Sequence, residues 1–123
     1  YVFNGANGAL TKEGNLLTAK VGDTVRIFFG VGGPNKTSSF HIIGEIFDRV
    51  YTFGALNSVP LTNVQTVTVP PGGAVMVELQ VNVPGQYLLV DHALSRTERG
   101  AVGFLVVKGP EQPEIFRQGT ASP

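Results

Sequence analysis

Apolar and polar residues alternate along several short stretches of the chain. The clearest stretch is 24–31, where Val25, Ile27 and Phe29 occupy every second position and predict a strand with one buried face. Further apolar or alternating runs predict strands over residues 16–20, 38–43, 64–69, 74–81, 86–92 and 101–107. Glycine and proline clusters at 32–35, 70–73 and 84–85 separate them. This succession predicts an all-β, Greek-key β-sandwich.

The segments between the strands predict turns and loops. Residues 51–59 lack periodicity and predict a long surface loop, whereas residues 94–100 predict one helical turn closed by Gly100. The 123 residues suffice for one domain with a real core, which we expect to span residues 1–109. Residues 110–123 contain three prolines and predict an extended arm.

Composition narrows the classes of function. Nine basic and nine acidic residues give no net charge and no basic stripe, which argues against a nucleic-acid partner or an anionic membrane surface. No apolar run approaches the ~20 residues of a membrane-spanning helix, so no membrane span is expected. The absence of cysteine excludes disulfides and leaves the compartment open. Because the chain starts at Tyr1 without a signal-like segment, we expect a processed or excised piece.

The only two histidines lie in apolar strands, His41 in SSFHIIGEIFD and His92 in GQYLLVDHALSR. Imidazole titrates near neutral pH and is the commonest metal ligand. Without cysteine, the pair cannot complete a metal site alone, so further ligands would come from another chain or domain. The alternatives are that His41 is a core histidine hydrogen-bonded to a backbone carbonyl, and that His92 is a surface histidine at the end of a strand. A hydrolase would need Ser39 or Ser95 as the nucleophile, and neither lies in a strained turn.

Four segments resemble the second cupredoxin domain of copper-containing nitrite reductases. They are SSFHIIGEIFDRVY, NVQTVTVPPGG, PGQYLLVDHALSR and GAVGFLVVKG, and the resemblance runs from about Phe3 to Phe116. Gly85 and Tyr87 match the Gly-x-Tyr pattern of cupredoxins, but Asp91 stands where that pattern leads to the copper-binding cysteine. No type 1 copper site is therefore expected in this chain.

The resemblance implies a set of roles. Members of that family are homotrimers of two-domain subunits that reduce nitrite to nitric oxide and lie in the periplasm or at the cell surface. The first domain supplies two histidines to a type 2 copper, and the second domain of the adjacent subunit supplies the third, which would be His92. His41 would deliver protons to the substrate, and Ile43 would roof the nitrite pocket. Gln65 and Thr66 stand where the family places a backbone carbonyl and a hydroxyl against the catalytic histidine.

The residues themselves are consistent with these roles. His41 and Ile43 project to the same face of a strand, and we expect Thr66 to fix the ring orientation of His41. Asp91 is expected to have a structural role, as a hydrogen-bonding residue for the loop that follows it. Three charged residues of that loop, Arg96, Glu98 and Arg99, predict a solvated face.

Two other classes of function stay open. One is a metal-free cupredoxin-like module that serves only in assembly. The other is a domain of a different multicopper oxidase, which would need paired His-x-His motifs that the sequence does not contain. Because a first domain is missing, the chain alone would offer one ligand to the catalytic copper, and we expect the isolated chain to be inactive.

Overall fold

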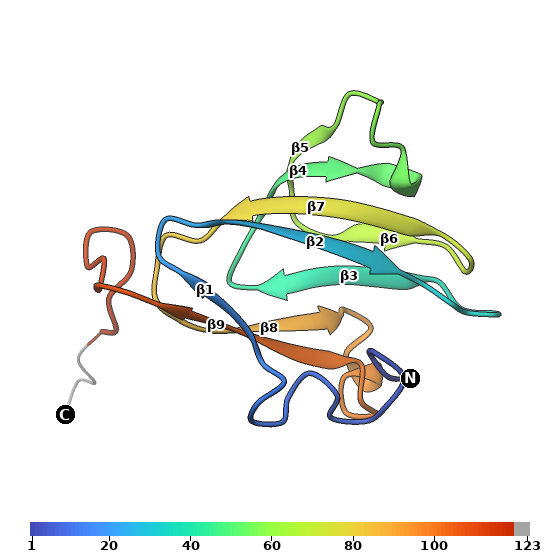
Figure 1. The fold of residues 1–123 in the computed structure, drawn as a ribbon, viewed down its shortest axis with the longest axis horizontal. Helices are drawn as coiled ribbons and strands as arrows, with labels where there is room; N and C mark the ends of the chain where they lie inside the picture. Colours follow the sequence, from blue (N-terminus) through green and yellow to red (C-terminus); the bar gives the residue numbers. More distant parts are fainter. Residues whose placement is uncertain (120–123) are drawn as a thin grey trace.

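Two β-sheets pack face to face in the computed structural model, which describes residues 1–119 (Figure 1). The five-stranded sheet has the order β1 (Leu17–Lys20), β9 (Val102–Lys108), β8 (Gly85–Asp91), β3 (Ser38–Ile43), β6 (Val67–Val69). The four-stranded sheet has the order β2 (Thr24–Gly30), β7 (Ala74–Gln80), β4 (Phe47–Tyr51), β5 (Leu61–Val64). The predicted all-β sandwich is confirmed.

Helical structure is limited, within residues 1–119, to two short 3-10 turns, η1 (Thr52–Gly54) and η2 (Leu94–Arg96). The second turn agrees with the helical turn predicted after His92. In the part of the chain that the structure describes, no helix has the length and apolar character needed to cross a membrane.

The core lies between the two sheets and is built from the alternating residues. Phe40 and Phe47 are almost completely buried, and their rings form a stack with Phe29, with centroids 4.1 Å (Phe29–Phe40) and 5.4 Å (Phe40–Phe47) apart. These rings come from β2, β3 and β4, so the stack joins both sheets. Burying three aromatic rings in one contact stabilises the pairing of the layers.

The predicted strand over residues 64–69 is wrong. Val64 ends β5 in the four-stranded sheet, Val67 begins β6 in the five-stranded sheet, and Gln65 and Thr66 cross from one sheet to the other. Val64 and Val67 both pack on the core although they lie three residues apart. A continuous strand would have placed them on opposite faces, because its side chains alternate with a period of two. Because the chain crosses between the sheets here, the side chains of both valines pack on the core.

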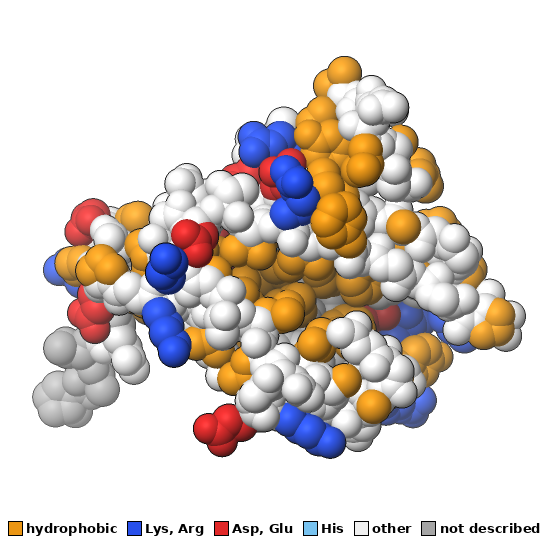
Figure 2. Space-filling model, in the orientation of Figure 1, with side chains coloured by type: hydrophobic (Ala, Val, Ile, Leu, Met, Phe, Trp, Pro, Cys, Tyr) orange, Lys and Arg blue, Asp and Glu red, His pale blue; other side chains and the backbone are white. Residues whose placement is uncertain are grey.

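The region before residue 60 also contains more strand than predicted. Phe47–Tyr51 forms β4, which pairs with β5 and β7, so Tyr51 ends a strand rather than starting a loop. The loop that follows is exposed, and its Phe53 has a positive φ of 58° and is 76 % exposed. Figure 2 shows apolar side chains gathered over this β4–β5 end and along the seam between the sheets.

The predicted arm over residues 110–123 is described only to residue 119, and residues 120–123 lie outside the described part. Residues 110–119 carry no strand and are almost all exposed. The backbone N–H groups of Ile115 and Phe116 both donate to the Gln112 carbonyl, at 2.9 Å, and form a turn. This turn brings the apolar side chains of Ile115 and Phe116 back toward the end of the sandwich.

Candidate functional site

The antiparallel pairing of β3 with β8 brings the two histidines together. His41 lies opposite Val90 in the ladder. Two residues further along, the backbone N–H of His92 donates to the Ser39 carbonyl at 2.8 Å, which continues the pairing beyond the end of β8. The histidines are therefore diagonal neighbours on one face of the sheet, and their ring centroids are 5.2 Å apart.

This face is the outer face of the five-stranded sheet. Phe40 and Ile42 point into the core and are 0 % exposed, so His41 and Ile43 point outward. His41 is nevertheless 8 % exposed, whereas Ile43 is 40 % exposed and His92 is also exposed. The structure thus places the buried imidazole of His41 beside the exposed imidazole of His92, and the side chain of Ile43 lies further along β3.

A single backbone carbonyl orients the buried ring. Nδ1 of His41 lies 2.5 Å from the carbonyl oxygen of Gln65. A carbonyl only accepts hydrogen bonds, so Nδ1 carries the hydrogen and Nε2 is the nitrogen left to other partners. Gln65 belongs to the crossing between β5 and β6, so the break in that predicted strand supplies this contact. Thr66 is exposed beside it, and its part in the site stays a prediction.

The residue before His92 anchors a dense polar network. Asp91 is 4 % exposed, and its carboxylate accepts hydrogen bonds from Ser38 Oγ (3.1 Å), the Ala93 N–H (3.0 Å) and Arg96 Nη1 (2.7 Å). Burial raises the pKa of the Asp91 carboxyl, but the hydrogen bonds from Arg96, Ala93 and Ser38 outweigh it and hold the pKa below its usual range. The hydrogen bond expected from Asp91 to the following loop is confirmed.

Arg96 has a structural role that was not predicted from the sequence. The solvated position expected for it is wrong, because its side chain is only 20 % exposed and its ion pair with Asp91 raises the pKa of the guanidinium. The guanidinium also donates to the Thr37 carbonyl at 2.6 Å and lies 4.7 Å from the centre of the Tyr1 ring. The signal available in the sequence was two opposite charges five residues apart around a tight turn.

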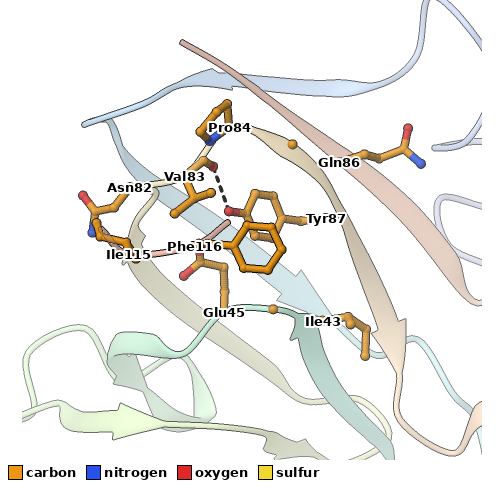
Figure 3. A pocket seen from close by; sticks show the side chains of 11 residues that line it. Ile43, Glu45, Asn82, Val83, Pro84, Gln86, Tyr87, Ile115 and Phe116 are labelled. Carbon is orange, nitrogen blue, oxygen red and sulfur yellow. Dashed lines mark hydrogen bonds between the residues drawn. The ribbon is translucent and has the colours of Figure 1, made fainter. Parts of the chain in front are cut away.

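A pocket of about 510 Å³ lies at the other end of β3, beyond Ile43 (Figure 3). Its wall includes Glu45 and Tyr87, together with Phe116 of the C-terminal segment. The Tyr87 hydroxyl donates to the Val83 carbonyl at 2.7 Å. Burial raises the pKa of Glu45, and burial together with the charge of Glu45 raises the pKa of Tyr87. Ile43 lines this pocket and also projects from the face of the histidines, as does Gln86 of β8.

Comparison with known proteins assigns this β-sandwich to a family. The Multicopper oxidase family matches residues 1–111. The chain belongs to that family.

Within the multicopper oxidase family, the chain is similar to copper-containing nitrite reductases. It is 52 % identical over 120 residues to the copper-containing nitrite reductase of Neisseria meningitidis serogroup A, covering 95 % of this chain and 30 % of the relative. The solved copper nitrite reductase of Nitrosomonas europaea aligns with a TM-score of 0.71 at 35 % identity, over 80 % of this chain and 34 % of that one. The enzyme of Thermus scotoductus SA-01 aligns with a TM-score of 0.79 at 33 % identity, over 89 % and 25 %. The chain spans about a third of the length of these relatives and matches their C-terminal portion.

The donor set of this multicopper oxidase domain fits a metal that is shared with another chain or domain. Within residues 1–119, no group of three or more histidine, cysteine or acidic side chains could hold a metal ion. The Asp91 carboxylate already accepts three hydrogen bonds, and Nδ1 of His41 is bound to a carbonyl. His92 offers an exposed imidazole, a ligand that suits copper. Copper held here would therefore need its other ligands from outside this chain.

Proposed function

We propose that the chain is the second cupredoxin domain of a copper-containing nitrite reductase that reduces nitrite to nitric oxide. The observation that carries this proposal is the pair of imidazoles on one outer sheet face, with ring centroids 5.2 Å apart. One ring is exposed and the other is buried and oriented by a carbonyl. Similarity to proteins named copper-containing nitrite reductase supplies the substrate and the metal for the proposal.

His92 is the proposed ligand of a type 2 copper. The remaining ligands would come from the first cupredoxin domain of an adjacent subunit in a homotrimer, which is consistent with an exposed imidazole that has no metal-binding cluster around it within residues 1–119. Copper bound there supplies a Lewis acid and a one-electron redox centre with an open position for nitrite. The periplasm or cell surface is the proposed location.

His41 is the proposed proton donor. Conversion of nitrite to nitric oxide and water consumes one electron and two protons. Imidazole exchanges protons near neutral pH, and the Gln65 carbonyl fixes the ring of His41 so that Nε2 is the exchanging atom. Burial keeps this imidazole in one place on the sheet face.

Ile43 is proposed to exclude water from the substrate. It projects from the same face of β3 as His41 and exposes 40 % of its surface, so it can form an apolar wall toward a ligand or a partner domain. Thr66, next to the orienting carbonyl of Gln65, is proposed to support the same ring through its hydroxyl.

Nitrite reduction with an artificial electron donor tests the proposed function. The chain should form nitric oxide when it is assembled with the copper-loaded first domain, and neither part should do so alone. Assembled, copper-loaded protein that makes no nitric oxide would overturn the proposal. Replacement of both histidines without any loss of nitric oxide formation would favour a metal-free assembly module instead.

A further inference from the structure

The backbone on both sides of His92 is held in place, although its imidazole is exposed. Its own N–H donates to the Ser39 carbonyl at 2.8 Å. The next N–H, of Ala93, donates to the Asp91 carboxylate at 3.0 Å. The carbonyl of Asp91 accepts a hydrogen bond from the Thr97 hydroxyl at 3.4 Å. The chain therefore leaves β8 in a defined direction just where the ring projects.

Arg96 closes the loop after His92 back onto Asp91. Its Nη1 donates both to Asp91 and to the Thr37 carbonyl, which lies just before β3. Its own carbonyl accepts the Ala101 N–H at 3.0 Å, just before β9. One residue thus joins the loop to the starts of both strands that flank β8, through its side chain toward β3 and through its backbone carbonyl toward β9. Figure 1 shows the N-terminus beside this loop. The Arg96 guanidinium there lies over the Tyr1 ring.

This anchoring matters because a metal shared between domains needs its ligands in place before the domains meet. An exposed histidine at a free strand end would sample several backbone and side-chain states, and ordering them would weaken metal binding. We propose that Asp91 and Arg96 are positioning residues that hold His92 in the geometry needed to bind copper. This inference rests on the proposed function of His92 as a ligand.

A second ion-paired carboxylate provides a matched control. Glu78 on the four-stranded sheet is 7 % exposed and pairs with Arg26 (3.4 Å) and Arg49 (3.7 Å). It therefore resembles Asp91 in burial and in arginine pairing. Because it lies on the other sheet, its loss should lower stability without disturbing the orientation of His92.

The test measures copper affinity in the complete enzyme by competition with a chelator, together with the copper electron paramagnetic resonance spectrum and the melting temperature. Arg96→Met keeps the apolar stem and removes the charge, and the dissociation constant for copper at the shared site should rise about 10-fold or more. Arg96→Lys should restore most of the affinity, because an ammonium still pairs with Asp91. Glu78→Gln should lower the melting temperature and leave the copper dissociation constant and the spectrum unchanged.

His92→Ala separates the two proposals. If it leaves the copper dissociation constant unchanged, His92 is not a ligand and the proposed function fails. If His92→Ala abolishes copper binding while Arg96→Met stays within about twofold of the native value, only the positioning inference is overturned. Should Arg96→Met fail to fold, Ser38→Ala removes one hydrogen bond to Asp91 instead, and an unchanged copper affinity in that variant overturns the inference equally.

Discussion

The two outer faces of the sandwich both carry polar side chains, but the faces differ in how these side chains are paired. On the four-stranded sheet, Glu78 lies directly across the strands from Arg26 and Arg49 and pairs with both. On the five-stranded sheet, His41 and His92 lie together, and the exposed imidazole of His92 faces outward. The first face pairs its carboxylate with its own arginines. The second face leaves exposed the imidazole of His92, which is the proposed copper ligand. The proposed function accordingly uses the second face.

His92→Ala in the complete enzyme should have the largest effect, and this effect should be confined to the face that carries the histidines. The change removes the proposed copper ligand, so copper at the shared site should be lost and nitrite turnover should fall below detection. Copper content by atomic absorption and nitric oxide formation measure the two effects. Ser95→Ala changes another exposed residue of the same loop and should leave both at the native level.

His41→Leu should separate proton delivery from metal binding. Leucine fills the buried site but exchanges no proton, so turnover should fall by about 10²- to 10⁴-fold while copper stays bound. Loss of copper together with activity would instead make His41 a ligand, and native turnover would remove it from the mechanism.

Glu78→Gln should affect stability alone. A neutral amide pairs less well with Arg26 and Arg49, so the free energy of unfolding in denaturant should fall by about 1.5 kcal/mol. Nitrite turnover should remain native. A matching loss of turnover would show that the four-stranded sheet also contributes to the functional site, contrary to the comparison of the two faces.

Glu45→Gln should give the smallest effect. Burial raises the folded-state pKa of Glu45 above its ordinary value, and no ion pair of this side chain occurs within residues 1–119. Folding therefore favours the protonated carboxyl, and this contribution is lost as the pH rises through the folded pKa. At neutral pH the glutamine should raise the melting temperature by roughly 1 to 2 °C, and below pH 4 the two proteins should melt together. A lower melting temperature at neutral pH would contradict this.

Most of the fold follows from local alternation of apolar residues. The strand over residues 38–43 was predicted with its observed bounds, and the pattern of Val25, Ile27 and Phe29 correctly gave the buried face of β2. The crossing at Gln65 could not be predicted in the same way. Alternation describes one strand at a time, whereas the crossing depends on two valines, in different sheets, that meet the same core.

The sequence predicted the two histidines of the candidate site, but it did not predict the residues that hold them in place. Two histidines in apolar strands indicated a site from the sequence alone, but their distance depends on the register of β3 against β8. The role of Arg96 was hidden for a different reason. A charged residue in a polar loop normally faces water, and only the fold brings Asp91 and the Thr37 carbonyl within reach of its guanidinium.

The most direct test of the proposed copper ligand is a crystal structure of the assembled, copper-loaded enzyme with anomalous diffraction collected at the copper edge. The proposed function predicts an anomalous peak about 2 Å from an imidazole nitrogen of His92, with His41 nearby but not bonded to the metal. A peak bonded to His41, or no copper within bonding distance of His92, would contradict it.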